Sequence, residues 1–144
     1  MTNTAVKQRK PRVVVDTNVI ISAVVFGGNP AQIITMGGTK AVELYLSQHI
    51  LQEVAGVLRK KFSWSPKQTR RTIEVLQRAA SVVKPTERIF IARDEDDNAV
   101  LECAMAAQAD YLISGDEDLL VLKENAGTKI VSPTQFIAFI QRKK

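Results

Sequence analysis

The sequence predicts an α/β fold, a three-layer α/β/α sandwich around a five-stranded parallel sheet. Two observations favour this class. Short runs rich in β-branched residues alternate along the chain with longer stretches of helical periodicity. The 144 residues, 45% of them hydrophobic, also suffice for one compact domain with a buried core. Right-handed crossovers between successive parallel strands would then place helices on both faces of the sheet.

Turn and capping residues divide the first part of the chain into elements. Glycine pairs at 27–28 and 37–38 end two helical stretches, and Ser65-Pro66 supplies an N-cap and a first helical turn. Ser47 caps another helix directly after an apolar run. The elements expected from these signals are a strand at 12–15, helices at 18–25 and 29–36, a strand at 42–46, and helices at 47–60 and 65–80.

The second part of the chain continues the alternation. A helix is expected to open at the acidic run 94–97 and to extend to about residue 108, and Ser132-Pro133 starts a last helix. Residues 1–11 are predicted to be a flexible basic arm, and residues 12–141 the folded domain. The strands expected in this part are at 81–84, 111–114 and 129–131.

Composition excludes several classes of protein. The one cysteine, Cys103, allows neither an internal disulfide nor a zinc site built on thiolates. No apolar run is long enough to span a bilayer, and the N-terminus lacks the apolar stretch of a signal peptide. We therefore expect a cytoplasmic protein that makes no membrane contact.

The distribution of charge says more than its total. The net charge of +5 weakly favours a polyanionic partner. Residues 94–118 hold nine of the fifteen acids, whereas residues 54–73 hold none. Two solvated helix faces would give the same pattern. The alternative is an RNA-binding surface made by the cations of this second segment, here called the basic stretch: Arg59, Lys60, Lys61, Lys67, Arg70 and Arg71.

Two carboxylates follow predicted strands. Asp16 comes directly after the first strand, and Asp116 lies two residues beyond Ser114 at the end of the fourth. In open parallel sheets the ligand site lies beyond the carboxyl ends of the strands. Both acids should therefore lie at the same edge of the sheet, where a ligand would bind.

A third carboxylate lies on the inward face of a predicted helix. Helical periodicity places Asp97 on the same face as Val100 and Leu101, one turn earlier. An acid on this face points at the sheet rather than at solvent, so a functional role is favoured. Helix capping is the favoured role of the acids just before it, Asp94, Glu95 and Asp96.

Converging carboxylates would require a cation. Like charges repel one another unless an ion neutralises them or one acid takes up a proton. Mg²⁺ and Mn²⁺ prefer such oxygen ligands.

Glu53 flanks the apolar stripe of its helix, where an isolated acid is usually solvated. His49, the only histidine, is interpreted as structural, without a catalytic role.

With these acids placed, the chain resembles the PIN domain family, in its VapC-like branch of toxin–antitoxin nucleases. Each motif is common by itself, but the ordered set with its spacing is specific. The motifs cover most of residues 12–140. The matching blocks are VVVDTNVIISAV at 13–24, LSQHILQEVAGVL at 46–58, DEDDNAVLECAMAAQADYLISGDEDLLVL at 94–122 and KIVSPTQFIAFI at 129–140.

The resemblance implies a ribonuclease that uses Mg²⁺ or Mn²⁺ to hydrolyse phosphodiester bonds of single-stranded RNA. It further implies a cognate antitoxin as partner and a homodimer or higher homo-oligomer. The metal ligands among the acids would be Asp16, Asp97 and Asp116. The whole catalytic set implied is Asp16, Glu53, Asp97 and Asp116. The supporting positions implied are Asn18, Ser114, Asp94 and Asp118.

Other functions remain possible on the same pattern. A non-catalytic RNA- or protein-binding module would keep the fold and the basic surface but would need no metal, and metal titration would distinguish it. A phosphoacceptor domain of the receiver type is disfavoured, because Lys129 stands at the start of its strand rather than following one. A dinucleotide-binding domain is disfavoured as well, because no G-x-G-x-x-G sequence follows the first strand.

Overall fold

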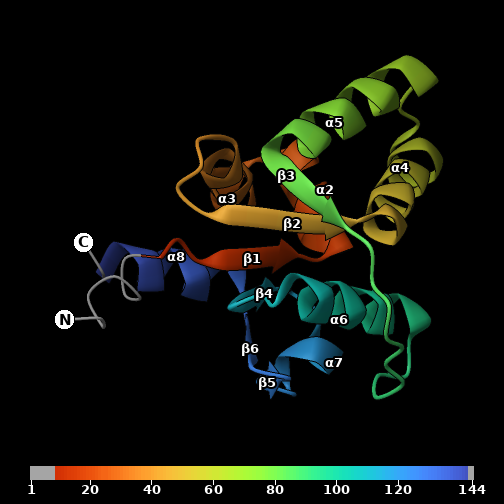
Figure 1. Ribbon diagram of the computed structural model, residues 1–144. Coiled ribbons are helices and arrows are strands. Elements are labelled where there is room, and N and C mark those ends of the chain that lie inside the picture. The colour runs from red at the N-terminus through yellow and green to blue at the C-terminus, as the bar shows by residue number, and fades with distance from the viewer. Residues whose placement is uncertain (1–8, 143–144) are drawn as a thin grey trace.

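The computed structural model describes residues 9–142 and confirms the α/β class, with a mostly parallel central sheet (Figure 1). Within these residues the sheet has six strands in the order β3-β2-β1-β4-β6-β5. Every neighbouring pair is parallel except β5 and β6. The strands are β1 (Arg12–Val15), β2 (Glu43–Ser47), β3 (Ala80–Val83), β4 (Tyr111–Ile113), β5 (Glu124–Asn125) and β6 (Thr128–Val131).

The strand count is one more than the sequence predicted. The additional strand, β5, has two residues and returns antiparallel to β6 through a tight turn. That turn uses positive φ values of 51° at Ala126 and 85° at Gly127. A strand of this length has no hydrophobic periodicity, which is why the sequence pattern did not reveal it.

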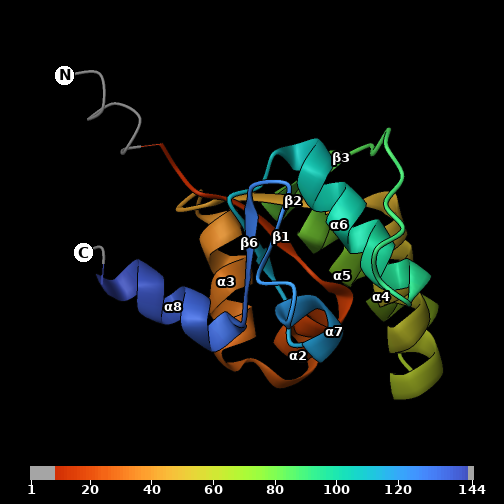
Figure 2. The same ribbon diagram turned by 90° about the horizontal axis from the view of Figure 1, so that it is seen from below.

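Helices cover both faces of the sheet. Helix α6 packs against β1, β2, β3 and β4. Figure 2 shows α6 on one side of the strands and α2 and α3 on the other, with α8 running beside α3. The helices are α2 (Thr17–Phe26), α3 (Gly28–Gly38), α4 (Gln48–Phe62), α5 (Pro66–Ala79), α6 (Glu95–Ala107), α7 (Glu117–Leu120) and α8 (Pro133–Arg142).

The core lies on both sides of the central strand. The three valines of β1 are completely buried, as expected for a parallel strand covered on both faces. Val15 of β1 pairs with Ile113 of β4, and Ser47 of β2 pairs with Val83 of β3. The carboxyl ends of these four strands therefore meet at one edge of the sheet, which positions the candidate site.

The chain ends are described only in part. The predicted flexible arm at residues 1–11 lies mostly outside the described residues, and so do residues 143 and 144. Within the described part of the arm, Arg9 forms an ion pair with Asp110 at 2.8 Å. Across residues 9–142 no single helix has the length and apolar character to cross a membrane. Helices α2 and α3, bent by 100° relative to each other, meet that criterion only when they are taken together, and only by length and composition.

Candidate metal centre

Asp16 stands at the carboxyl end of β1 and begins α2. Its backbone N–H donates to the Ile113 carbonyl at 3.0 Å, which continues the pairing with β4 for one more residue. Its side chain caps α2, because Oδ1 accepts a hydrogen bond from the backbone N–H of Asn18 at 2.7 Å. The residue is only 4% exposed, and this burial raises the pKa of Asp16. The sheet edge thus carries a buried carboxylate.

Ser114 links the ends of β1 and β4. Its fully buried hydroxyl donates to Asp16 Oδ2 at 2.5 Å and accepts from the backbone N–H of Asp116 at 3.0 Å. One serine oxygen therefore fixes both the Asp16 carboxylate and the start of the turn that carries Asp116. Sequence matching assigned Ser114 a supporting position, and this bridging contact is compatible with that role.

Asp97 occupies the first turn of α6 and is 7% exposed. Burial, followed by the charge of Asp116, raises its pKa from 3.8 to about 7. The nearby charges of Asp94 and Asp16 raise this pKa further. Asp97 Oδ2 is buried without a hydrogen-bond partner among the described residues. A buried oxygen without a partner is costly, so this atom is suited to a ligand.

Asp116 completes a close group of acids. It caps the short helix α7 by accepting from the backbone N–H of Asp118 at 2.8 Å. Carboxylate oxygens of Asp97, Asp116 and Asp118 lie within 4.8 Å of one another. Asp118 also forms an ion pair with the exposed Arg93 at 3.1 Å. Asp118, expected only as a supporting position, therefore belongs to the same close group as Asp97 and Asp116.

Glu53 lies in an adjoining second group. Its carboxylate accepts from the Thr17 hydroxyl at 2.6 Å, so it is held beside the residue that follows Asp16. Burial raises its pKa, the Thr17 hydrogen bond opposes this rise, and the neighbouring charge of Asp96 adds to it. Ligand atoms of His49, Glu53 and Asp96 lie within 4.8 Å of one another. The structure thus brings Glu53 next to Asp96, rather than into the close group of Asp97.

Two residues given supporting positions by the resemblance, Asn18 and Asp94, lie at the margin of the site, and so does His49, which was interpreted as structural. Asn18 is exposed, and its contact with Asp16 uses the backbone N–H. Asp94 caps α6 by accepting from the backbone N–H of Asp96 at 2.8 Å, as favoured from the sequence, and its charge also raises the Asp97 pKa. His49 is bonded through Nε2 to Asp96 Oδ1 at 2.8 Å.

Four residues near the acids were missed as site residues: Thr17, His49, Arg93 and Asp96. The spacing of His49 and Glu53, four apart on one helix, could have indicated a shared face. The contacts of Arg93 with Asp118 and of Thr17 with Glu53 join residues far apart in the chain. No local sequence pattern indicates contacts between residues so far apart in the chain.

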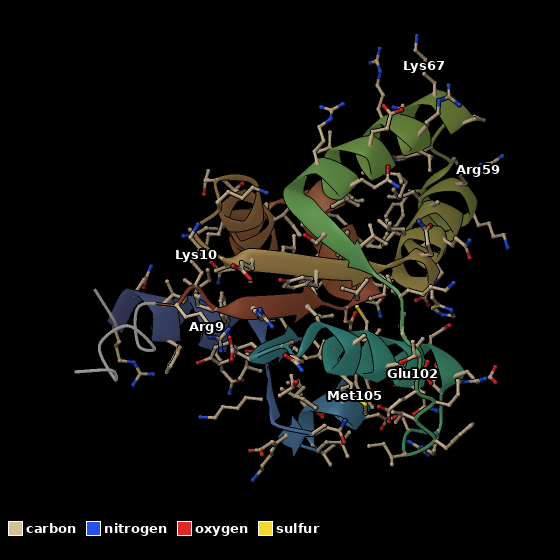
Figure 3. The ribbon with its side chains drawn as sticks, viewed as in Figure 1. Arg9, Lys10, Arg59, Lys67, Glu102 and Met105 are labelled. Atoms are coloured by element: carbon tan, nitrogen blue, oxygen red, sulfur yellow. The ribbon has the colours of Figure 1, made fainter. Side chains whose placement is uncertain are left out.

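The basic stretch lies at the end of α4 and the start of α5, and its six side chains are all exposed. Figure 3 shows Arg59 and Lys67 at the far end of these helices from α6. A cavity of about 290 Å³ is lined by Glu53, Lys60 and Lys61, among others, and therefore extends from the basic stretch to Glu53. Phe62 and Trp64 are partly buried and pack against the core.

The residues present fit a hard divalent cation. The donors are carboxylate oxygens, the kind of ligand that Mg²⁺ and Mn²⁺ prefer. Asp97 offers an oxygen that has no other partner among the described residues. A cation would also neutralise the repulsion that Asp16 and Asp116 exert on Asp97. The negative charge, the type of donor atom and the unpartnered oxygen therefore all suit a divalent cation.

Comparison with known proteins gives consistent matches. A family model described as PIN domain matches residues 12–118. An uncharacterized protein of Methanocaldococcus jannaschii is 28% identical over 141 residues, which cover 89% of this chain and 90% of that protein.

Two solved structures share the fold. VapBC-1 from nontypeable Haemophilus influenzae matches with a TM-score of 0.62 at 18% identity, covering 85% of this chain and 98% of that chain. PAE2754 from Pyrobaculum aerophilum matches with a TM-score of 0.59 at 13% identity, covering 91% of this chain and 90% of that chain.

Proposed function

The chain belongs to the PIN domain family, and from that premise we propose that it is a metal-dependent endoribonuclease that hydrolyses phosphodiester bonds of single-stranded RNA. PIN domains are generally nucleases and typically use divalent metal ions. The single observation that carries the proposal is the Asp97 carboxyl group, which is buried beside Asp16 and Asp116 with one oxygen unpartnered among residues 9–142. Acids held this way create a demand for positive charge.

Asp16, Asp97 and Asp116 would hold Mg²⁺ or Mn²⁺. Bound there, the ion would lower the pKa of a water molecule and stabilise the charge that develops on the scissile phosphate. Asp97 must lose its proton to serve as a ligand, and its pKa of about 7 places that loss near neutral pH. The rigid contacts of Ser114 with Asp16 and with the Asp116 backbone would hold these two acids in place.

Glu53 would act beside these ligands rather than among them. Its raised pKa brings it closer to the range in which a carboxylate accepts a proton from an attacking water near neutral pH. The hydrogen bond from Thr17 would orient the carboxylate for this transfer. Asp96 and His49, bonded to each other at 2.8 Å, would tune the charge around Glu53.

RNA would approach over the basic stretch. The acidic pocket repels phosphate, so cations nearby must offset that repulsion. The cavity shared by Glu53, Lys60 and Lys61 supports a path from the basic surface to the carboxylates. The resemblance to the toxin–antitoxin branch extends the proposal to a toxin whose antitoxin covers the pocket, and to a homodimer.

The test is cleavage of a labelled single-stranded RNA in Mg²⁺ or Mn²⁺. Asp16→Asn and Asp97→Asn, made separately, should each lower the rate at least about a hundredfold, because each removes a charge from the cation site. The matched control is Glu124→Gln, which removes one exposed carboxylate on β5 and should leave the rate unchanged. Undiminished cleavage by both folded asparagine variants would overturn the assignment.

A further inference from the structure

A groove runs along α6 beside the candidate centre. Two cavities, of about 510 Å³ and about 230 Å³, share the lining residues His49, Ala99 and Glu102 and therefore adjoin. One reaches the end of β3 at Val83 and Lys84, and the other reaches the connection between β3 and α6. Figure 1 shows this connection running alongside α6. The two cavities together are called the α6 groove below.

The connection that walls the α6 groove is fastened to the helix. The backbone N–H of Ile89 donates to Glu102 at 2.9 Å, and Arg88 forms an ion pair with the same carboxylate at 3.4 Å. Asn98 donates to the Ala92 carbonyl at 3.0 Å and accepts from the Ala92 N–H at 2.8 Å. A wall held by several bonds presents its side chains in a fixed position.

An exposed aromatic ring stands on this wall. Phe90 is 76% exposed, although it is a large apolar side chain. The Arg88 guanidinium lies over its ring, 5.4 Å from the centroid. Lys84, at the other end of the groove, is exposed as well. Exposed aromatic rings interleaved with cations are what single-stranded nucleic acids use for stacking and for phosphate contacts.

The α6 groove ends at His49, beside Glu53 and Asp96. His49 lines both cavities and is bonded to Asp96, which precedes Asp97 in α6. His49 also belongs to the close group that contains Glu53. A chain of nucleotides whose phosphate reached the candidate centre would therefore have a neighbouring nucleotide at the groove.

We propose that the α6 groove binds one base of single-stranded RNA, stacked on Phe90, with Lys84 and Arg88 facing the adjacent phosphates. His49 and Glu102 line the groove with polar atoms that can meet the edge of the base. Glu95 and Glu102 also line the groove, and Glu102 is paired with Arg88, so Lys84 and the exposed Phe90 ring are the features that favour a nucleotide over an apolar peptide segment. This inference rests on the proposed function, because it takes RNA as the ligand.

The experiment measures binding without cleavage. The full chain is titrated, in EDTA, against a fluorescein-labelled single-stranded RNA and against the same strand with one base replaced by an abasic sugar, moved position by position. The parent protein should lose about tenfold in affinity at one abasic position, as expected for a stacked base. Phe90→Ala should bind the intact strand about tenfold more weakly and should no longer distinguish that abasic position.

Three further variants sharpen the result. Phe90→Trp keeps a ring and should restore the distinction, whereas Ala99→Phe fills the groove from α6 and should abolish it. Phe26→Ala is the matched control, because Phe26 is also 76% exposed but lies at the end of α2 against Phe62, at the opposite end of α4 from His49. Equal losses for Phe26→Ala and Phe90→Ala, or no abasic effect in the parent, would overturn the proposal. Since the assay needs no cleavage, failure of the nuclease proposal alone would leave the abasic effect intact.

Discussion

Asp96 and Asp97 are neighbours in α6, yet the fold moves their pKa values in opposite directions. The hydrogen bond to His49 lowers the pKa of Asp96. Burial and the charge of Asp116 raise the pKa of Asp97 to about 7. A helix turns by about 100° per residue, so one acid faces His49 and the other faces the sheet edge. Periodicity alone predicted the inward position of Asp97, but the His49 contact depends on how α4 packs against α6.

Asp97 should make the metal-free protein less stable as the pH rises. Its pKa is about 7 in the folded chain and 3.8 as a model value, so the unfolded chain releases its proton first. Stability therefore falls between about pH 4 and pH 7 and stays lower above that range. Asp97→Asn removes this loss and should raise the Tm at pH 8 in EDTA, by roughly 2–4 °C per kcal/mol regained.

Thermal unfolding followed by circular dichroism at pH 5 and pH 8 measures this effect. Glu124→Gln serves as the control, since its carboxylate is exposed on β5. If Asp97→Asn and the parent lost the same stability between the two pH values, the burial argument for Asp97 would be wrong.

At the scale of elements, α3 is held against the sheet by a close approach at Gly37. A Cβ built at Gly37 would lie 2.8 Å from Leu44 Cδ2 and 3.2 Å from the Ala79 carbonyl oxygen. Gly38, the next residue, would meet nothing within 4 Å. The sequence indicated this glycine pair as a helix end, and α3 does end at Gly38. The packing reason for Gly37 needs the position of β2, which no local pattern contains.

The glycine pair provides a matched test of this packing. Gly37→Ala should destabilise the protein by about 1–3 kcal/mol, because its methyl group overlaps β2 and the end of α5. Gly38→Ala should instead stabilise it by about 0.5–1 kcal/mol, because alanine is the better helix former. Chemical denaturation of both variants measures the two changes. Equal stabilities would contradict the close approach.

At the scale of the whole molecule, the acids lie at the carboxyl edge of the sheet, and the basic stretch lies at the end of α4 and the start of α5. Alternating strand and helix patterns predicted the parallel sheet, because the buried valines of β1 and the helix caps are local signals. The same topology predicted that Asp16 and Asp116 share an edge. The patterns did not predict α7, the two-residue β5 or the grouping of Glu53 with Asp96. Those features arise from short elements and from contacts between distant residues.

Charge reversal tests the basic stretch. Arg70→Glu combined with Arg71→Glu should weaken binding of single-stranded RNA and lower the slope of log K against log salt by about 1.4, because each lost phosphate contact removes about 0.7. The charge-matched control is Lys123→Glu with Lys129→Glu, two exposed lysines near β5 and β6, at the other end of the molecule from α5 (Figure 1). A salt slope that stays unchanged in the arginine variant would remove the stretch from the RNA footprint.

Calorimetric titration of the purified chain with Mn²⁺ at pH 7 tests most directly whether the buried aspartates form a cation site. The parent should bind Mn²⁺ and release part of a proton, since Asp97 is about half protonated at that pH. Asp16→Asn and Asp97→Asn should each bind at least about tenfold more weakly, and Asp97→Asn should release no proton. Equal Mn²⁺ affinity in the parent and in both folded variants would contradict the existence of this metal centre.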